Sequence, residues 1–89
     1  MALLDLLGRR WTLRVLWELH GKPLTFRDLQ AACGQISPTI LNTRIRELRD
    51  AAIVHQDDAG YALTGEGESL VKELIGLHNW ADRWAKRKL

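Results

Sequence analysis

The pattern of apolar and polar positions divides this chain into segments bounded by glycine, proline and helix-capping residues. Helical spacing predicts a short helix and a core helix within 2–20, and a pair of helices within 25–51. Two short apolar segments that flank turn residues predict a β-hairpin within 53–63, and a long helix follows over 64–86. We therefore expect a single domain over 1–89, mainly α with one small hairpin, in the order of four helices, two strands and a final helix.

Residues 25–51 are predicted to form two helices joined by a very short turn. Thr25 has a side chain that caps a helix N-terminus, and Gly34 follows the last apolar position, where glycine takes the left-handed conformation at little cost. Ser37 supplies a second capping oxygen, and Pro38 occupies the first helical position, where its missing N–H costs nothing. The short turn between these signals predicts a helix-turn-helix.

The second helix of this pair has two chemically different sides. Leu41, Ile45 and Leu48 fall within one narrow arc and predict the buried side. On the other side, short polar residues let a helix approach the floor of a DNA groove, and arginine can donate two hydrogen bonds to guanine. We expect base contacts from Thr39, Asn42, Thr43 and Arg46, and DNA backbone contacts from Ser37, Arg44 and Arg49. The alternative is an ordinary amphipathic helix with a solvated arginine side.

Apolar residues also recur along the last predicted helix, at alternating steps of four and three. A helix this long leaves apolar surface uncovered on a small domain, as does the leucine-rich N-terminal segment. Both features predict a homodimer. The interface residues expected from the pattern are Leu3, Leu4, Leu7, Leu70, Leu74, Leu77, Ala81 and Trp84.

Three segments, GRRWTLRVLWEL, LTFRDLQAACGQISPTILNTRIRELRDAAIV and YALTGEGESL, resemble the HxlR-type winged helix-turn-helix regulators, a branch of the MarR-like group. The most specific parts are Trp-Thr-Leu at 11–13, Ile-Ser-Pro at 36–38, Arg-Ile-Arg-Glu-Leu at 44–48 and Leu-Thr-x-x-Gly at 63–67. The resemblance covers nearly the whole chain. It implies a prokaryotic transcription regulator with a winged-helix fold that binds operator DNA as a homodimer.

The hairpin departs from the family's pattern. In the resembled family the wing is longer and often carries basic residues that touch DNA, whereas this one is short and has Asp57 and Asp58 at its tip. Carboxylates near phosphates are repelled unless counterions are retained. We therefore expect the wing to contribute little to DNA affinity or to tilt away from the duplex.

Composition and charge agree with a nucleic-acid-binding domain without requiring one. The 89 residues include 46% hydrophobic residues, enough for one core, and carry a net charge of +2. Residues 1–56 contain eight Lys or Arg against five Asp or Glu, residues 57–75 contain one against five, and residues 76–89 contain four against one. The helix-turn-helix and the C-terminal end are therefore basic, and the region between them is acidic.

Other chemistry is not indicated. The single cysteine, Cys33, cannot form an internal disulfide and lies on an apolar helix stripe, so we expect a buried structural thiol in a reducing compartment, with a redox sensor as the alternative. The chain lacks a signal-peptide pattern and an apolar segment long enough to span a membrane, which predicts a cytoplasmic protein. Scattered histidines, with no catalytic motif, predict neither a metal site, nor a cofactor, nor an enzyme.

Two alternatives to a simple operator-binding regulator stay open. Four tryptophans are many for this length, and Trp11, Trp17, Trp80 and Trp84 either fill the core and interface or line a pocket for a small-molecule effector at the dimer interface. The acidic wing favours an interaction module that binds protein instead of DNA. The main expectation is a homodimer on double-stranded DNA, with a pseudo-palindromic operator whose half-sites lie about ten base pairs apart.

Overall fold

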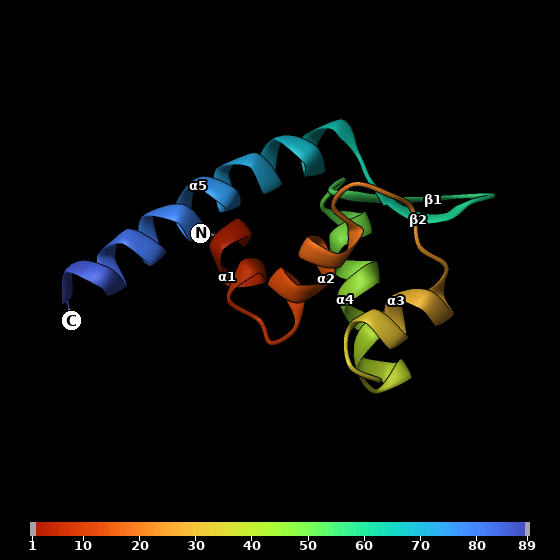
Figure 1. Cartoon of the computed structure of the whole chain (residues 1–89). Coiled ribbons are helices and arrows are strands. Elements are labelled where there is room, and N and C mark those ends of the chain that lie inside the picture. Colours follow the sequence, from red (N-terminus) through yellow and green to blue (C-terminus); the bar gives the residue numbers. More distant parts are fainter. Residues whose placement is uncertain (1, 89) are drawn as a thin grey trace.

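A computed structural model describes residues 2–88. The elements in chain order are α1 (Ala2–Leu7), α2 (Thr12–Leu19), α3 (Phe26–Ala32), α4 (Pro38–Asp50), β1 (Val54–Asp57), β2 (Gly60–Leu63) and α5 (Gly65–Lys88). The first four helices and the hairpin form one body, and the second half of α5 extends beyond it, away from the hairpin (Figure 1). The predicted fold class, with four helices, two strands and a final helix, is confirmed.

The core lies where α2, α3 and α4 meet. On α2, Val15, Leu16 and Leu19 are fully or almost fully buried, in agreement with the predicted core helix. Residues of the other elements close the core around them: Leu29, Cys33, Ile36, Leu41, Ile45, Leu48, Ile53, Val54, Leu63 and Val71. The buried side of α4 is therefore the one that the pattern predicted.

The other side of α2, which the pattern predicted only as part of a core helix, is open to solvent. Leu13 and Trp17 remain 49% and 48% exposed. Trp11 precedes the helix with a left-handed backbone (φ 79°), and the helix begins at Thr12. Apolar periodicity does not distinguish a side chain covered by its own chain from one left open to solvent, so the sequence could not show that one side of α2 is exposed.

The helix-turn-helix forms through the predicted caps. The Thr25 hydroxyl oxygen accepts a hydrogen bond from the Asp28 N–H (3.1 Å), and the Ser37 hydroxyl oxygen accepts one from the Ile40 N–H (3.4 Å). Gly34 is left-handed as predicted (φ 72°), and Gln35 follows it in the same conformation (φ 62°). Two successive left-handed residues turn the chain sharply enough to seat α4 against α2 and α3.

The hairpin is tied to the body by a short third segment. Strands β1 and β2 pair antiparallel, and Leu24 pairs with Tyr61 through two backbone hydrogen bonds of 2.9 and 2.8 Å. A Cβ atom at Gly60, where φ is 117°, would lie 2.4 Å from the Leu24 carbonyl oxygen. Glycine is therefore required there for both conformation and space.

The start of α5 explains the Leu-Thr-x-x-Gly motif. The Thr64 hydroxyl accepts a hydrogen bond from the Gly67 N–H (3.0 Å) and donates to the Ala52 carbonyl oxygen (2.6 Å). Gly67 is buried, and a Cβ atom there would lie 2.2 Å from the Ile53 carbonyl oxygen. The motif therefore caps α5 and presses its first turn against the chain that leads into β1.

Candidate nucleic-acid interface

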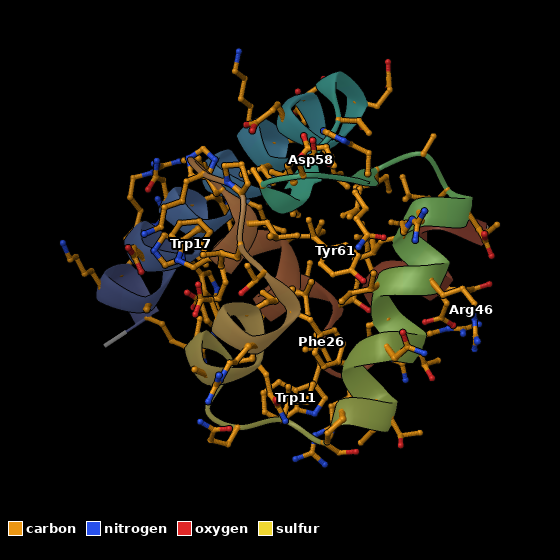
Figure 2. All side chains as sticks on the ribbon, turned by 90° about the vertical axis from the view of Figure 1, so that its right-hand side faces the viewer. Trp11, Trp17, Phe26, Arg46, Asp58 and Tyr61 are labelled. Atoms are coloured by element: carbon orange, nitrogen blue, oxygen red, sulfur yellow. The ribbon has the colours of Figure 1, made fainter. Side chains whose placement is uncertain are left out.

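The outer side of α4 presents polar side chains to solvent. Thr39, Asn42 and Arg46 are exposed, on the side of the helix opposite the buried Leu41 and Ile45. Figure 2 shows Arg46 extending from α4 away from the body. Small polar groups near the start of the helix and an extended guanidinium on its next turns form a surface that can approach base edges in a major groove.

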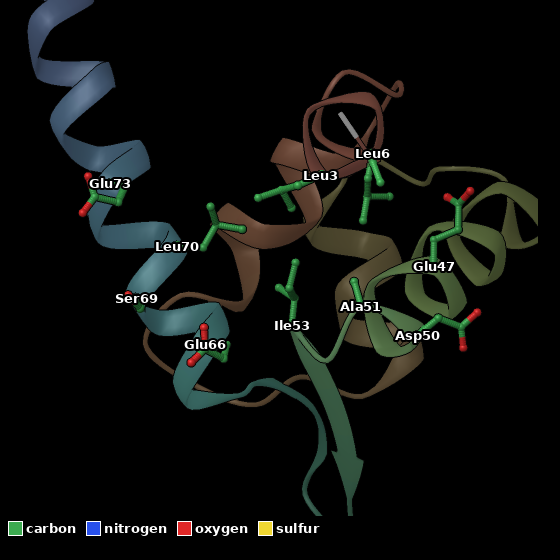
Figure 3. A pocket seen from close by; sticks show the side chains of 11 residues that line it. Leu3, Leu6, Glu47, Asp50, Ala51, Ile53, Glu66, Ser69, Leu70 and Glu73 are labelled. Carbon is green, nitrogen blue, oxygen red and sulfur yellow. The ribbon is translucent and has the colours of Figure 1, made fainter.

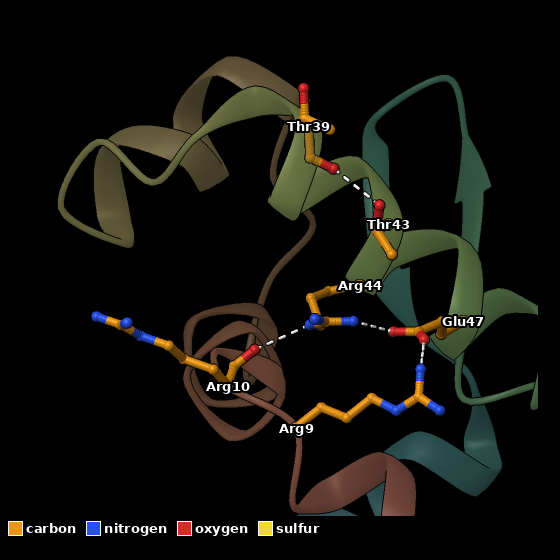
Figure 4. Close-up of polar contacts among 6 residues, drawn as sticks. All are labelled: Arg9, Arg10, Thr39, Thr43, Arg44 and Glu47. Carbon is orange, nitrogen blue, oxygen red and sulfur yellow. Dashed lines mark hydrogen bonds and ion pairs between the residues drawn. The ribbon is translucent and has the colours of Figure 1, made fainter.

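The side chain of Thr43 is less accessible than those of the other three predicted base-contacting residues. Its hydroxyl donates a hydrogen bond to the Thr39 carbonyl oxygen (2.9 Å), and the residue is half-buried (Figure 4). This bond within the helix uses the hydroxyl proton. The oxygen can still accept a hydrogen bond, so Thr43 suits a donor on the DNA better than an acceptor.

Arg44 does not lie on the outer side of α4. Its Nε donates to the Arg10 carbonyl oxygen (2.9 Å) and its Nη1 to the Glu47 carboxylate (2.5 Å), and its side chain is only 18% exposed. Arg9 pairs with the other oxygen of Glu47, so that two arginines share one carboxylate (Figure 4). The predicted phosphate contact at Arg44 remains a prediction. In this structure the side chain joins α4 to the segment before α2, and the sequence could not show that Arg10 and Glu47 come together there.

The other predicted backbone contacts remain accessible. Ser37 is exposed at the N-terminus of α4, where unpaired backbone N–H groups attract anions. Arg49 is exposed at the other end of the helix, with its Nη1 3.4 Å from Oε1 of Gln56 on β1. The two residues mark the ends of the polar side of α4.

A polar hollow of about 360 Å³ lies between α4 and the hairpin, lined by Asn42, Ile45, Arg46, Arg49, Asp50 and Tyr61. Tyr61 was missed as a candidate site residue because the pattern identified it only as a strand residue. Its place beside Arg46 and Arg49 depends on how the hairpin packs against α4, which no local sequence signal specifies.

The hairpin tip is negatively charged. Asp57 and Asp58 are both exposed, and the Asp57 carboxylate accepts a hydrogen bond from the Ala59 N–H (2.8 Å), which holds the turn. Asp58 lies on the hairpin, on a different element from Arg46 (Figure 2). The Asp57 carboxylate therefore has a structural role in the turn, and the two carboxylates together make the tip acidic.

Cys33 is buried, 1% exposed, at the end of α3. Burial raises the pKa of its thiol, and the positive charge of Arg14 offsets part of that rise. A raised pKa keeps the thiol protonated and poorly nucleophilic at neutral pH. These properties agree with the structural thiol expected from the sequence.

The predicted dimer residues lie in two kinds of surroundings. Leu7, Leu70 and Leu74 are half-buried against their own core, whereas Leu3, Leu4 and Leu77 are exposed, as are Ala81 and Trp84. The dimer interface remains a prediction, and the side chains of the second group are exposed to solvent in the single chain.

An apolar groove of about 530 Å³ separates α2 from the middle of α5. Leu13 and Trp17 line it from α2, and Leu74, Leu77 and Ala81 line it from α5. The ring centroid of Trp17 lies 5.9 Å from that of His78, at the same groove.

Two further properties concern residues 2–88 as a whole. No helix among them is long and apolar enough to cross a membrane. Within the same residues, no group of three or more His, Cys, Asp or Glu side chains is placed to hold a metal ion.

Comparison with known proteins identifies the family. The family model described as HxlR-like helix-turn-helix matches residues 6–89. YvaP of Bacillus subtilis, named as an HTH-type transcriptional regulator, is 28% identical over 87 residues, which span 90% of this chain and 81% of YvaP. Quinone-bound YodB from B. subtilis superimposes with a TM-score of 0.86 at 29% identity, covering 92% of this chain and 93% of YodB. A possible HxlR family transcriptional factor from Thermoplasma volcanium gives a TM-score of 0.81 at 28% identity, covering 93% and 81%. This chain therefore belongs to the HxlR-like helix-turn-helix family.

Proposed function

We propose that the protein is a transcriptional regulator that binds double-stranded operator DNA as a homodimer. The carrying observation is the polar outer side of α4, where Thr39, Asn42 and Arg46 are exposed while the opposite side is fully packed into the core. A helix held rigidly by its buried side can present the other side to a major groove without further ordering. The family to which the chain belongs supports the same function.

The exposure and hydrogen bonds of each side chain support different proposed roles for the predicted contact residues. We assign base edges to Thr39, Asn42, Thr43 and Arg46, because three of these are exposed and the fourth keeps a free acceptor. The start of α4 at Ser37 and the guanidinium of Arg49 take phosphates. Arg44 instead holds α4 in place through Arg10 and Glu47.

A symmetric dimer places two copies of α4 in successive major grooves. For helix-turn-helix dimers the half-sites lie about 34 to 36 Å apart, which is one turn of DNA. The operator is then a pseudo-palindrome with half-site centres about ten base pairs apart.

Salt dependence of DNA binding tests this function. Phosphate contacts release counterions, so the logarithm of the affinity for duplex DNA should fall linearly with the logarithm of the salt concentration. Arg49→Ala should reduce the slope of this line by the amount expected for about one phosphate contact per protomer. Fluorescence anisotropy with a labelled duplex measures both. A folded protein that binds no duplex at low salt would contradict the proposal.

A second candidate is an interaction module that binds protein, favoured by the exposed carboxylates of Asp57 and Asp58 at the hairpin tip. Such a module would show little or no binding to duplex DNA at any salt concentration. The same salt series therefore separates it from operator binding.

A third candidate adds a small-molecule effector to the DNA-binding function. It is favoured by the apolar groove between α2 and α5, and by the quinone bound in the similar structure of YodB. Because Trp17 lines the groove, an effector bound there should quench its fluorescence and change DNA affinity at the same concentration. A quenching ligand that leaves DNA binding unaltered would argue against an effector site.

A further inference from the structure

The apolar groove between α2 and α5 continues into a basic hollow of about 440 Å³ at the segment before α2. Leu13 and Arg14 line both spaces, so the two form one surface. The basic hollow is also lined by Arg9, Arg10 and Trp11, and by the end of α1. One end of this surface is therefore apolar, and the other end carries three arginines.

Two of these arginines keep hydrogen-bond donors available. Arg10 makes no ion pair within residues 2–88, and its guanidinium carbon lies 5.7 Å from the centroid of the Trp11 ring. Its side chain extends away from α4 (Figure 4). Arg14 donates from Nε to Glu18 and from Nη2 to the Ala32 carbonyl oxygen, and its Nη1 donates to no group in the described part of the chain. Both guanidinium groups can therefore bind an anion.

The surface has no acidic wall. Among residues 2–88, no carboxylate lines the groove or the basic hollow. Glu18 and Glu47 pair with Arg14 and Arg9, but neither glutamate lines these spaces. The charge that faces a ligand at the basic end is therefore positive.

The groove itself has the size and the aromatic wall of a small-molecule site. Its volume of about 530 Å³ lies within the range of roughly 300–1,000 Å³ that is typical of such sites. Trp17 of α2 is 48% exposed, and its ring centroid lies 5.9 Å from that of His78 on α5. Leu74 and Leu77 continue the apolar wall along α5. An apolar chain in the groove would cover surface that the single chain leaves open to water.

We propose that this surface binds an amphipathic anion, a molecule with a carboxylate or phosphate head on an apolar tail. The head lies at Arg10 and Arg14, which donate charge-assisted hydrogen bonds to it. The tail lies between α2 and α5, against Trp17. This inference rests on the effector candidate of the proposed function and names the chemical class of its ligand.

An acidic hollow of about 640 Å³, between α1 and the first turns of α5, has the opposite charge (Figure 3). Its walls combine apolar side chains with the carboxylates of Glu47, Asp50, Glu66 and Glu73. An anionic head would be repelled there, and a cationic amphiphile would be attracted. The charge of a bound amphiphile therefore distinguishes the two hollows.

Arg14 also connects the surface to the helix-turn-helix. Its Nη2 donates a hydrogen bond of 2.6 Å to the carbonyl oxygen of Ala32, the last residue of α3. A head group that draws the guanidinium away weakens this bond at the end of α3. Bound ligand should therefore lower the affinity for duplex DNA.

Decanoate and decyltrimethylammonium test the charge of the ligand, because they share one apolar tail and differ in the sign of the head. Isothermal titration calorimetry is run below the micelle concentration of each. Decanoate should bind roughly tenfold more tightly, as expected for charge-assisted hydrogen bonds to its carboxylate. Equal affinity, or a preference for the cation, would overturn the inference.

Substitution of single arginines tests where the head lies. Arg14→Gln and Arg10→Gln should each weaken decanoate binding roughly tenfold. Because Arg10 makes no ion pair within residues 2–88, Arg10→Gln should leave the fold intact, which circular dichroism checks. Arg27→Gln is the matched control, since Arg27 is exposed on α3 and lines neither space, and it should bind decanoate as the wild type does. Equal losses in all three variants would show general attraction of an anion to a basic protein and would contradict the site.

Decanoate that carries bromine at the end of its tail tests where the tail lies. Bromine quenches the fluorescence of a tryptophan that it contacts, so quenching should saturate at the concentrations that calorimetry gives. Trp17→Phe should remove a large part of this quenching and still bind the ligand, because phenylalanine keeps an apolar ring in the groove. Quenching that Trp17→Phe leaves unchanged would place the tail elsewhere and overturn the inference.

Duplex and membrane binding are measured separately. Saturating decanoate should lower the duplex affinity of the wild type roughly fivefold or more, and an unaltered affinity would refute the coupling through Arg14. A chain that binds decanoate as inferred but binds no duplex would refute operator binding and leave the site standing. Binding to phosphatidylglycerol vesicles without binding of free decanoate would assign the arginines to a membrane surface and overturn the site.

Discussion

Two glycines of α5 have opposite surroundings, and alanine at each should change stability in opposite directions. At Gly67 an added Cβ would lie 2.2 Å from the Ile53 carbonyl oxygen, whereas nothing lies within 4 Å of a Cβ at Gly76. Gly67→Ala should lower the free energy of unfolding by about 1–3 kcal/mol through overpacking. Gly76→Ala should raise it by about 0.5–1 kcal/mol, since alanine is the better helix former. Urea unfolding at one fixed protein concentration checks both, and a loss of equal size at the two positions would contradict this view of the α5 start.

The neighbouring arginines of α4 should behave differently when replaced by alanine. Arg46 points outward, so Arg46→Ala should cost about 1–3 kcal/mol on the specific site and relax the preference at one base pair. Arg44 is bonded to Arg10 and Glu47, so Arg44→Ala should lower the free energy of unfolding and leave base preference unaltered. Binding to single-base operator variants and urea unfolding measure the two effects. A uniform loss across all sequences on Arg46→Ala would reassign that residue to phosphate binding.

The buried thiol of Cys33 should make stability depend on alkaline pH. Burial raises its pKa above the ordinary value of 9.0, so the folded state favours the neutral thiol. That contribution is complete below about pH 9 and is lost as pH rises through the folded-state pKa, because only the unfolded chain ionises freely. Between neutral pH and about pH 10, the wild type should therefore lose more stability than Cys33→Ala. Parallel pH slopes would show that the thiol is not buried in solution.

The helix-turn-helix was predictable because its signals are local. Thr25 and Ser37 cap from the positions that their side chains suggested, and Gly34 takes the left-handed turn. The left-handed Gln35 has no comparable signal, since glutamine disfavours that conformation, and the Nε2 group of Gln30 supports the turn by donating to the Ile36 carbonyl oxygen (3.0 Å). Contacts that join distant segments, such as Arg9 with Glu47, could not be predicted, because they depend on how helices pack.

The hairpin is the element in which this chain departs most from the pattern of the family it resembles, and its charge has a direct test. If the tip came close to phosphates, Asp57→Asn with Asp58→Asn would raise DNA affinity by removing repulsion. Because the tip is acidic, we expect it to lie away from the duplex and the affinity to stay within about twofold. Asp57 also holds the turn through the Ala59 N–H, so Asp58→Asn alone is the cleaner variant. Anisotropy titrations at low salt measure the change, and a clear gain in affinity would place the tip at the DNA.

Helix α5 shows that an apolar pattern does not predict which of its residues are buried. Apolar residues recur along the whole helix, but the pattern did not separate Leu70 and Leu74, which pack against their own core, from the exposed Leu77 and Trp84. Both groups recur at the same spacing. The distinction depends on where the body of the domain ends, and that is a property of the folded chain.

Residues 2–88 form an elongated shape, with principal extents of 44 × 26 × 24 Å, because the second half of α5 extends beyond the other described elements (Figure 1). The surface of α4 proposed for DNA and the free end of α5 lie at different ends of this shape (Figure 1). A dimer formed through α5 therefore leaves both copies of α4 uncovered. This separation is what a regulator needs in order to dimerise and bind an operator at the same time.

Selection of bound sequences from a random duplex pool tests the central claim most directly. The purified protein is mixed with the pool at low and at moderate salt, and the retained fragments are recovered and sequenced. A dimeric operator-binding regulator should enrich a two-fold-symmetric motif with half-site centres about ten base pairs apart, and Arg46→Ala should blur one position in each half-site. Retention without any enriched motif, or enrichment of a single unpaired half-site, would contradict the account.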